Sequence, residues 1–131
     1  MTRHDLVGKV RDLGRYTTDR EAEGVLRAVL AALGAQLVGD ERCDLAAVLP
    51  DEARTVFAAQ IPLTEPVDAR GFVDLVARAL GTSPAEARWH SGSVLAALDE
   101  AAGRSLTDRV LAQLPPGYAL LFGRAQLATA A

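Results

Sequence analysis

The chain has 131 residues, half of them apolar, and a formal net charge of −3, which is the usual size of one domain. About a third of the residues are Ala or Leu and only 5 % are aromatic, so the composition predicts an all-α domain. A single cysteine excludes an internal disulfide and a cysteine-based metal cluster. No apolar run approaches about 18 residues, and the N-terminus lacks the basic-then-apolar pattern of a signal peptide. We therefore expect a cytoplasmic protein with no membrane partner.

Four helices are predicted in the first half of the chain. Apolar residues three and four positions apart predict the first helix, which Gly14 ends. Thr18 and Glu21 form a capping box before a second, longer helix. Asp40 is predicted to cap the third helix, and Leu49-Pro50 turns the chain into a fourth. The predicted buried positions are Leu6, Val7, Val10 and Leu13 on the first helix, Val25, Leu26, Val29, Leu30, Leu33 and Leu37 on the second, and Val56 and Phe57 on the fourth.

A linker over residues 60–68 separates the two halves. Its core, Ile61-Pro62-Leu63-Thr64-Glu65-Pro66-Val67, cannot be helical because its two prolines lie four residues apart. The segment is short and apolar, so we expect it to pack against the helices.

Four more helices are predicted in the second half. Asp68 caps the first of them, and Ser83-Pro84-Ala85-Glu86 is a capping box with proline at the first helical position. Ser105 and Asp108 are predicted to cap the third by the same reciprocal bonds, and Pro115-Pro116 ends it. Gly81 and Gly103 are the other predicted helix ends, and the predicted buried positions are Phe72, Val73, Val76, Leu80, Ala87, Ser91, Val94, Leu95, Leu98, Ala102, Tyr118, Leu121 and Phe122.

The two halves resemble each other in sequence. A shift of 65 positions aligns residues 17–59 with 82–124 and gives 12 identities in 43 pairs, where roughly four are expected by chance. The matches are clustered: Val29-Leu30-Ala31-Ala32-Leu33 recurs as Val94-Leu95-Ala96-Ala97-Leu98, and Phe57 recurs as Phe122. We interpret this as a duplication of one helical unit.

The duplicated units are predicted to form one domain rather than two. The repeats span about 4–59 and 70–123, and a unit of about 60 residues buries too small a share of its surface to be more than marginally stable. Burying four or five Leu or Val side chains between the units would add roughly 1.5–3 kcal/mol each before entropy is subtracted. We therefore expect two tandem repeats of about four helices each, in a pseudo-two-fold helical bundle over residues 1–131.

The order and spacing of these motifs resemble the DUF2267 family of bacterial proteins of unknown function. The resemblance covers Leu6 to Phe122, and it implies a helical fold without implying an activity. Members of that family often carry an aromatic segment after the first Leu-Pro element, where this chain reads Val56-Phe57-Ala58-Ala59-Gln60. The motifs that carry the resemblance are Ala22 with Val25 to Leu33, Leu45 to Pro50, Gly71 to Ala77, Glu86-Ala87, Val94 to Leu98 and Val110-Leu111-Ala112-Gln113-Leu114-Pro115.

Trp89 and His90 are the most distinctive candidate residues. At 100° per residue, Trp89 lies almost opposite the apolar face of its helix and His90 lies at the edge of that face. One interpretation is an intermolecular patch, because aromatic residues are enriched at protein interfaces. The other is that Trp89 packs on the first repeat, against the Gly24 side of its long helix. A role of His90 as a catalytic base is disfavoured because the sequence places no acid, nucleophile or metal ligand beside it.

The sequence gives little support for a reactive cysteine, a metal site or a nucleic-acid surface. Cys43 follows Arg42 near a helix start, where a dipole and a cation can activate a thiol, but no histidine is placed beside it. The acidic pairs lack the spacing of a metal loop, so no metal site or cofactor is predicted. The 13 arginines and one lysine alternate with acids, which disfavours a nucleic-acid surface.

These observations favour a non-catalytic helical module that binds another protein or itself. The alternative is a small-molecule-binding domain with an apolar pocket between the repeats, faced by Trp89, His90 or Tyr118. A DNA-binding regulator is the weaker third hypothesis, and no catalytic constellation indicates an enzyme.

Overall fold

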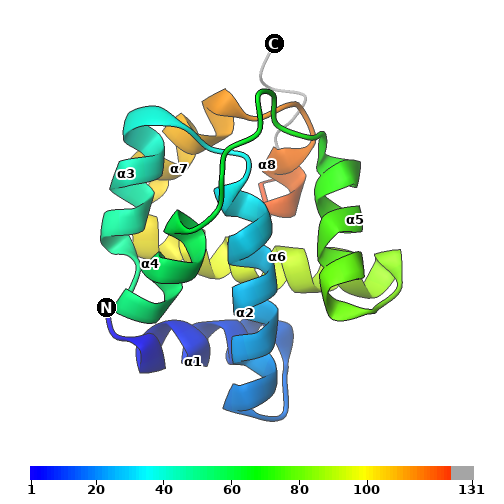
Figure 1. The fold of residues 1–131 in the computed structure, drawn as a ribbon. Coiled ribbons are helices and arrows are strands. Elements are labelled where there is room, and N and C mark those ends of the chain that lie inside the picture. The colour runs from blue at the N-terminus through cyan, green and yellow to red at the C-terminus, as the bar shows by residue number, and fades with distance from the viewer. Residues whose placement is uncertain (125–131) are drawn as a thin grey trace.

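The computed structural model describes residues 1–124, which form eight α-helices and no strand (Figure 1). The predicted all-α class is therefore confirmed. The helices are α1 (Arg3–Gly14), α2 (Asp19–Gly34), α3 (Gly39–Val48), α4 (Asp51–Ala58), α5 (Ala69–Leu80), α6 (Pro84–Ala102), α7 (Arg104–Gln113) and α8 (Tyr118–Leu121).

Polar caps fix the start of the longer helices. Ser83 and Glu86 form the predicted capping box at α6, and the Asp68 side chain accepts the Gly71 N–H at 2.7 Å at the start of α5. At α2 the Thr18 hydroxyl accepts the Glu21 N–H at 3.1 Å. The Glu21 carboxylate, however, accepts from the amide of Thr17, so the predicted box is displaced by one residue.

The predicted N-cap of the third helix is wrong in both halves. Val38, not Asp40, is the N-cap of α3, and Gly103, not Ser105, is the N-cap of α7. Neither N-cap makes a side-chain hydrogen bond. At α3, the Gln113 side chain accepts the Val38 N–H at 3.1 Å and donates to the Val38 carbonyl at 2.8 Å. A contact between α7 and the start of α3 thus holds the N-cap of α3, which local sequence could not indicate.

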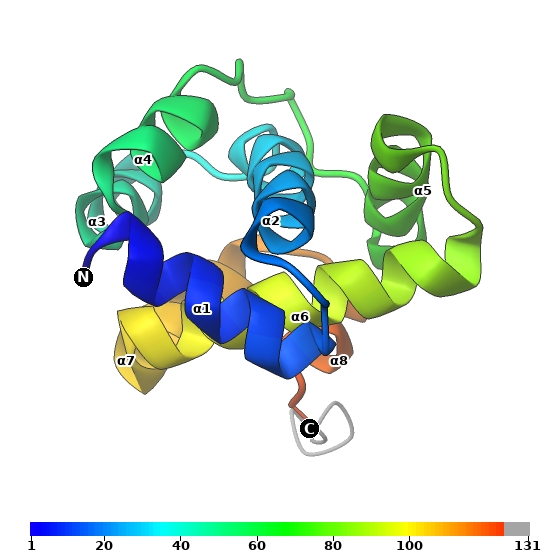
Figure 2. The same cartoon turned by 90° about the horizontal axis from the view of Figure 1, so that it is seen from below.

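Helix α6 is the centre of the fold. It contacts α1, α2, α3, α5, α7 and α8, and Figures 1 and 2 show α1 running alongside it while α2 crosses it. Because neighbours cover more than one side of α6, Ser93 and Ala97 are buried in addition to the predicted apolar face.

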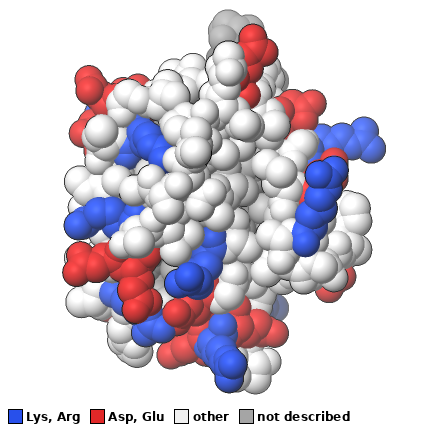
Figure 3. Space-filling view, viewed as in Figure 1, with Lys and Arg blue, Asp and Glu red and all other residues white. Residues whose placement is uncertain are grey.

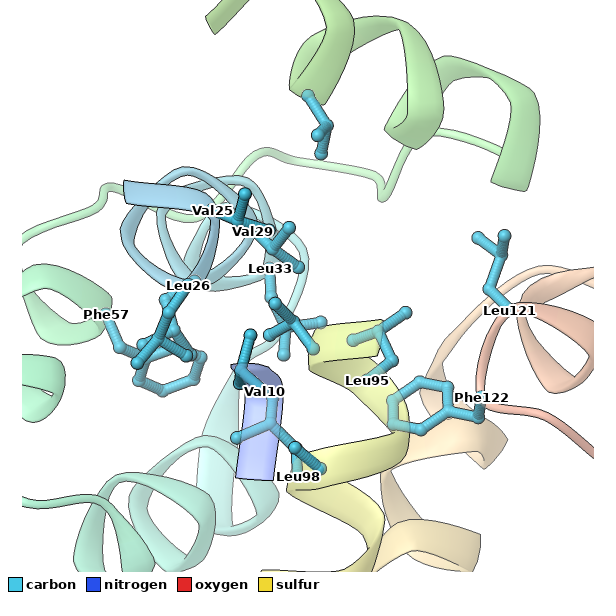
Figure 4. Close-up of a cluster of buried hydrophobic side chains, with 14 of the residues drawn as sticks. Val10, Val25, Leu26, Val29, Leu33, Phe57, Leu95, Leu98, Leu121 and Phe122 are labelled. Atoms are coloured by element: carbon cyan, nitrogen blue, oxygen red, sulfur yellow. The ribbon is translucent and has the colours of Figure 1, made fainter. Parts of the chain in front are cut away.

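One continuous hydrophobic core joins the two halves. Figure 4 shows Val10 of α1, Leu33 of α2 and Leu98 of α6 converging between the helices. Phe57 of α4 points toward α2, and Phe122 at the end of α8 points toward α6 (Figure 4). Both phenylalanines are buried.

The linker does not pack as predicted. Ile61 is 85 % exposed and Leu63 is 45 % exposed. The linker is held by its backbone instead: the Leu63 N–H donates to the Ala35 carbonyl at 2.9 Å, and the Val67 N–H donates to the Gln36 side chain at 2.8 Å. These bonds attach the extended chain to the C-terminal end of α2. Of its apolar side chains, Ile61 and Leu63 remain exposed, whereas Val67 packs against the core.

Charged side chains of both signs are mixed on the surface. The face shown in Figure 3 carries them mainly along its lower part and sides, with acids beside bases. Arg109 of α7, for example, pairs with Glu41 at 2.9 Å and with Asp44 at 2.8 Å, both on α3. This face therefore offers no continuous basic surface.

Candidate functional site

Trp89 lies on the outer side of α6 with 53 % of its surface exposed. Its indole N–H donates to the Gly14 carbonyl at the end of α1 over 3.0 Å. It does not pack against Gly24, because a Cβ built on Gly24 would meet no atom within 4 Å. The ring is thus held in one orientation by α1 while its face remains accessible.

His90 bonds to Tyr16, a residue the sequence did not single out. The Tyr16 hydroxyl lies 2.5 Å from His90 Nδ1, and the ring centroids are 5.5 Å apart. Burial lowers the pKa of His90, and the carboxylates of Glu86 and Glu21 oppose that shift. Burial also raises the pKa of Tyr16. A neutral imidazole and a protonated phenol therefore hold the turn after α1 against α6.

A groove runs along the N-terminal half of α6, between α8, the end of α1 and the start of α5. It consists of two adjoining open hollows of about 390 and 490 Å³ that share Ala85, Arg88, Leu120 and Leu121. Figure 2 shows α8 against the middle of α6 and α5 over its N-terminal end. We call this surface the Trp89 groove; its principal lining residues are Leu13, Val73, Arg88, Trp89, Gly92 and Leu120.

Large apolar side chains of the groove remain in contact with solvent. Leu120 is 46 % exposed and Leu13 is 40 % exposed, beside the half-exposed Trp89. Leu13 was predicted to lie in the core, but it sits on the outer side of α1 and lines the groove. Exposed apolar groups that adjoin in a concavity are typical of a binding surface.

Two arginines line the groove without an ion pair among residues 1–124. Arg70 on α5 and Arg88 on α6 are both exposed. Asp74 is the single carboxylate among the described lining residues. The groove therefore carries a local positive charge on a chain whose net charge is negative.

The other sequence candidates lie elsewhere. Cys43 is exposed on α3, in its second turn rather than its first. Tyr118 is fully buried, with its hydroxyl donating to the Val67 carbonyl at 2.7 Å and its ring edge-on to Phe72. It lines neither hollow of the Trp89 groove. Neither residue therefore joins Trp89 and His90.

Arg42 has a structural role that the sequence analysis missed. Its guanidinium donates to the carbonyls of Leu37 at 3.0 Å and Gln60 at 2.7 Å, and also to that of Gly34. It also lies 5.2 Å from the centre of the Phe57 ring. The side chain thus points toward the ends of α2 and α4, which local sequence gives no means of predicting.

Among residues 1–124, no group of three or more His, Cys, Asp or Glu side chains is placed to hold a metal ion. None of the described helices has the length and apolar character needed to span a bilayer.

Comparison with known proteins gives a family. The sequence model described as "Uncharacterized conserved protein (DUF2267)" matches residues 3–121. The chain belongs to the DUF2267 family. The resemblance drawn from the helix motifs is thereby confirmed over nearly the whole chain. No curated protein matches this DUF2267 chain.

Proposed function

We propose that this DUF2267 protein is a non-catalytic helical module that associates with another protein, or with a second copy of itself, through the Trp89 groove. The observation that carries the proposal is the apolar, open groove along α6, with Trp89, Leu120 and Leu13 exposed beside one another. Completing the burial of these half-exposed side chains would contribute roughly 1 kcal/mol each. Together with Trp89 as an anchor, such a surface has the composition of an interface centre.

Association is favoured over an enclosed ligand pocket. The small hollows between helices, one beside Leu30 and one beside Leu98, each hold about 10 Å³, room for about one water molecule. Small-molecule sites typically enclose a few hundred Å³ and bury most of the ligand. Among the described residues, three hollows of about 390–490 Å³ are open to the surface, two around Trp89 and one beside Pro50. An open surface of this kind suits a protein segment better than a metabolite.

We further propose that the fold arose from two tandem repeats, 4–59 and 70–123, in a cytoplasmic bacterial protein. Helix contacts support the duplication. α1 packs on both α2 and α6, while its proposed counterpart α5 packs on α6 and α2. Likewise α4 packs on α2 and α8 on α6, and the proposed counterparts α2 and α6, and α3 and α7, contact each other. Trp89 stands at the position equivalent to Gly24 in the alignment, so the first repeat has no tryptophan at the corresponding place.

Site-specific photo-crosslinking in cells tests the association. A benzoylphenylalanine placed at Leu120 is expected to give a discrete crosslinked species, because the side chain lies within the groove. The same residue placed at Arg20, exposed on α2 and outside the groove, is the control. No discrete species from position 120, or equal species from both positions, would contradict the proposal.

A further inference from the structure

The shape of the Trp89 groove favours a helical occupant. Its floor follows α6 from Pro84 to Ala96, and twelve residue steps of a helix extend about 18 Å. Between these ends the groove is deep at Gly92, because glycine has no side chain to fill it. A Cβ built on Gly92 would meet only the Leu121 carbonyl, at 3.8 Å. Leu120 and Trp89 flank that point with exposed apolar surface. A partner helix of about three turns would fill this length and place one apolar face against the groove.

The charge of the groove selects among amphipathic helices. Arg88 lines both hollows, Arg70 lines the outer one, and Asp74 supplies the opposing charge. An apolar helix flanked by lysines would meet two guanidiniums opposed by a single carboxylate, whereas a helix flanked by carboxylates would pair with the two guanidiniums. Charge complementarity of this kind fixes register and excludes wrong partners.

From this geometry we infer that the Trp89 groove binds an acidic amphipathic helix of about three turns from a partner protein. The inference rests on the proposed association function and adds the chemistry of the partner. The apolar face of that helix packs on Trp89 and Leu120, and its Asp or Glu side chains pair with Arg70 and Arg88.

Selection from a phage library of random 16-residue peptides, with the full chain as bait, tests this chemistry. Enriched peptides are expected to combine apolar residues at i, i+4 and i+7 with flanking Asp or Glu. Their affinity should fall about tenfold or more for Gly92→Glu, which fills and charges the floor, and severalfold for Arg88→Glu. Binding should also weaken as salt is raised.

Matched controls separate the groove from the rest of the surface. Gly24→Glu makes the same substitution on α2, where a Cβ meets no atom within 4 Å, and Arg20→Glu makes the same charge change away from the groove. Both replaced glycines lie inside helices, so a longer side chain favours folding at each. The two control variants are expected to bind the selected peptides as the wild type does.

Three outcomes would overturn the inference. Enriched peptides that are neutral or basic would refute the predicted charge, and acidic peptides that bind Gly92→Glu unchanged would refute the site. If no peptide enriches and light scattering shows a wild-type dimer that Gly92→Glu converts to a monomer, a second copy occupies the groove. In each case a crosslink from Leu120 would still support the proposed association, so failure of this inference is distinguishable from failure of that function.

Discussion

Arg42 gives the clearest stability prediction. Its guanidinium donates to three carbonyls: that of Gly34 at the end of α2, that of Leu37, and that of Gln60 after α4. Replacement by methionine keeps most of the apolar stem and removes every donor. Unpaired carbonyl groups at the ends of two helices would then remain.

The size of the effect follows from these bonds. Hydrogen bonds to a charged group contribute about 1.5–3 kcal/mol each, and a cation at a helix C-terminus adds about 0.3–1 kcal/mol. Arg42 is only partly buried, so solvent offsets part of this sum. We expect Arg42→Met to lower the free energy of unfolding by about 3 kcal/mol and Tm by about 10 °C. Arg42→Lys should lose about half as much, because an ammonium cannot reach separated acceptors as a planar guanidinium does.

Urea unfolding followed by circular dichroism measures both values. Arg20→Met is the control, because Arg20 is exposed on α2, and its replacement should change stability by less than about 0.5 kcal/mol. A loss at Arg42 no larger than the loss at Arg20 would refute the structural role. Equal stability of Arg42→Lys and wild type would refute the argument from geometry.

Two further predictions concern pH. Burial lowers the pKa of His90 in the folded state. The stability that neutral His90 contributes is therefore complete above its ordinary pKa of about 6.5 and is lost as pH falls through the folded pKa. Between pH 7 and pH 5 the urea midpoint should fall less steeply for His90→Asn than for wild type, and parallel profiles would contradict this. Burial raises the pKa of Tyr118, so its contribution is complete below its ordinary value of about 10 and is lost as pH rises above it. Tyr118→Phe should therefore lose about 1–2 kcal/mol at pH 8 from the bond to the Val67 carbonyl, and its midpoint should decline less between pH 9 and pH 11; an unchanged midpoint at pH 8 would contradict the role of that bond.

The helices themselves could be predicted from the sequence because their signals are local. The capping box of Ser83 and Glu86, the Asp68 cap and the apolar spacing of α2 each lie within a few residues. The prediction failed at α3, where the helix start has a distant partner. Gln113 holds Val38 from 75 positions away, and no pattern around Asp40 reveals it.

Only part of the candidate site could be predicted from the sequence. Helical geometry correctly placed Trp89 away from the main apolar face, since a 100° turn per residue depends on local structure alone. The contact of His90 with Tyr16 spans 74 positions, and the groove needs α8 and α1 to be placed beside α6. Leu13 was assigned to the core because its spacing fits that face, yet α6 covers α1 over a narrower stripe and leaves Leu13 exposed.

The central claim is that the protein associates through the Trp89 groove, and the native mass of the tagged chain tests it most directly. Wild type, Gly92→Glu and Gly24→Glu are each purified from the native host and measured by size exclusion with light scattering. Wild type and Gly24→Glu are expected to elute above the mass of one tagged chain, which is 13.8 kDa plus the tag, while Gly92→Glu is expected to elute as a folded monomer. Monomers in all three, or the same larger mass in all three, would contradict an association surface at the Trp89 groove.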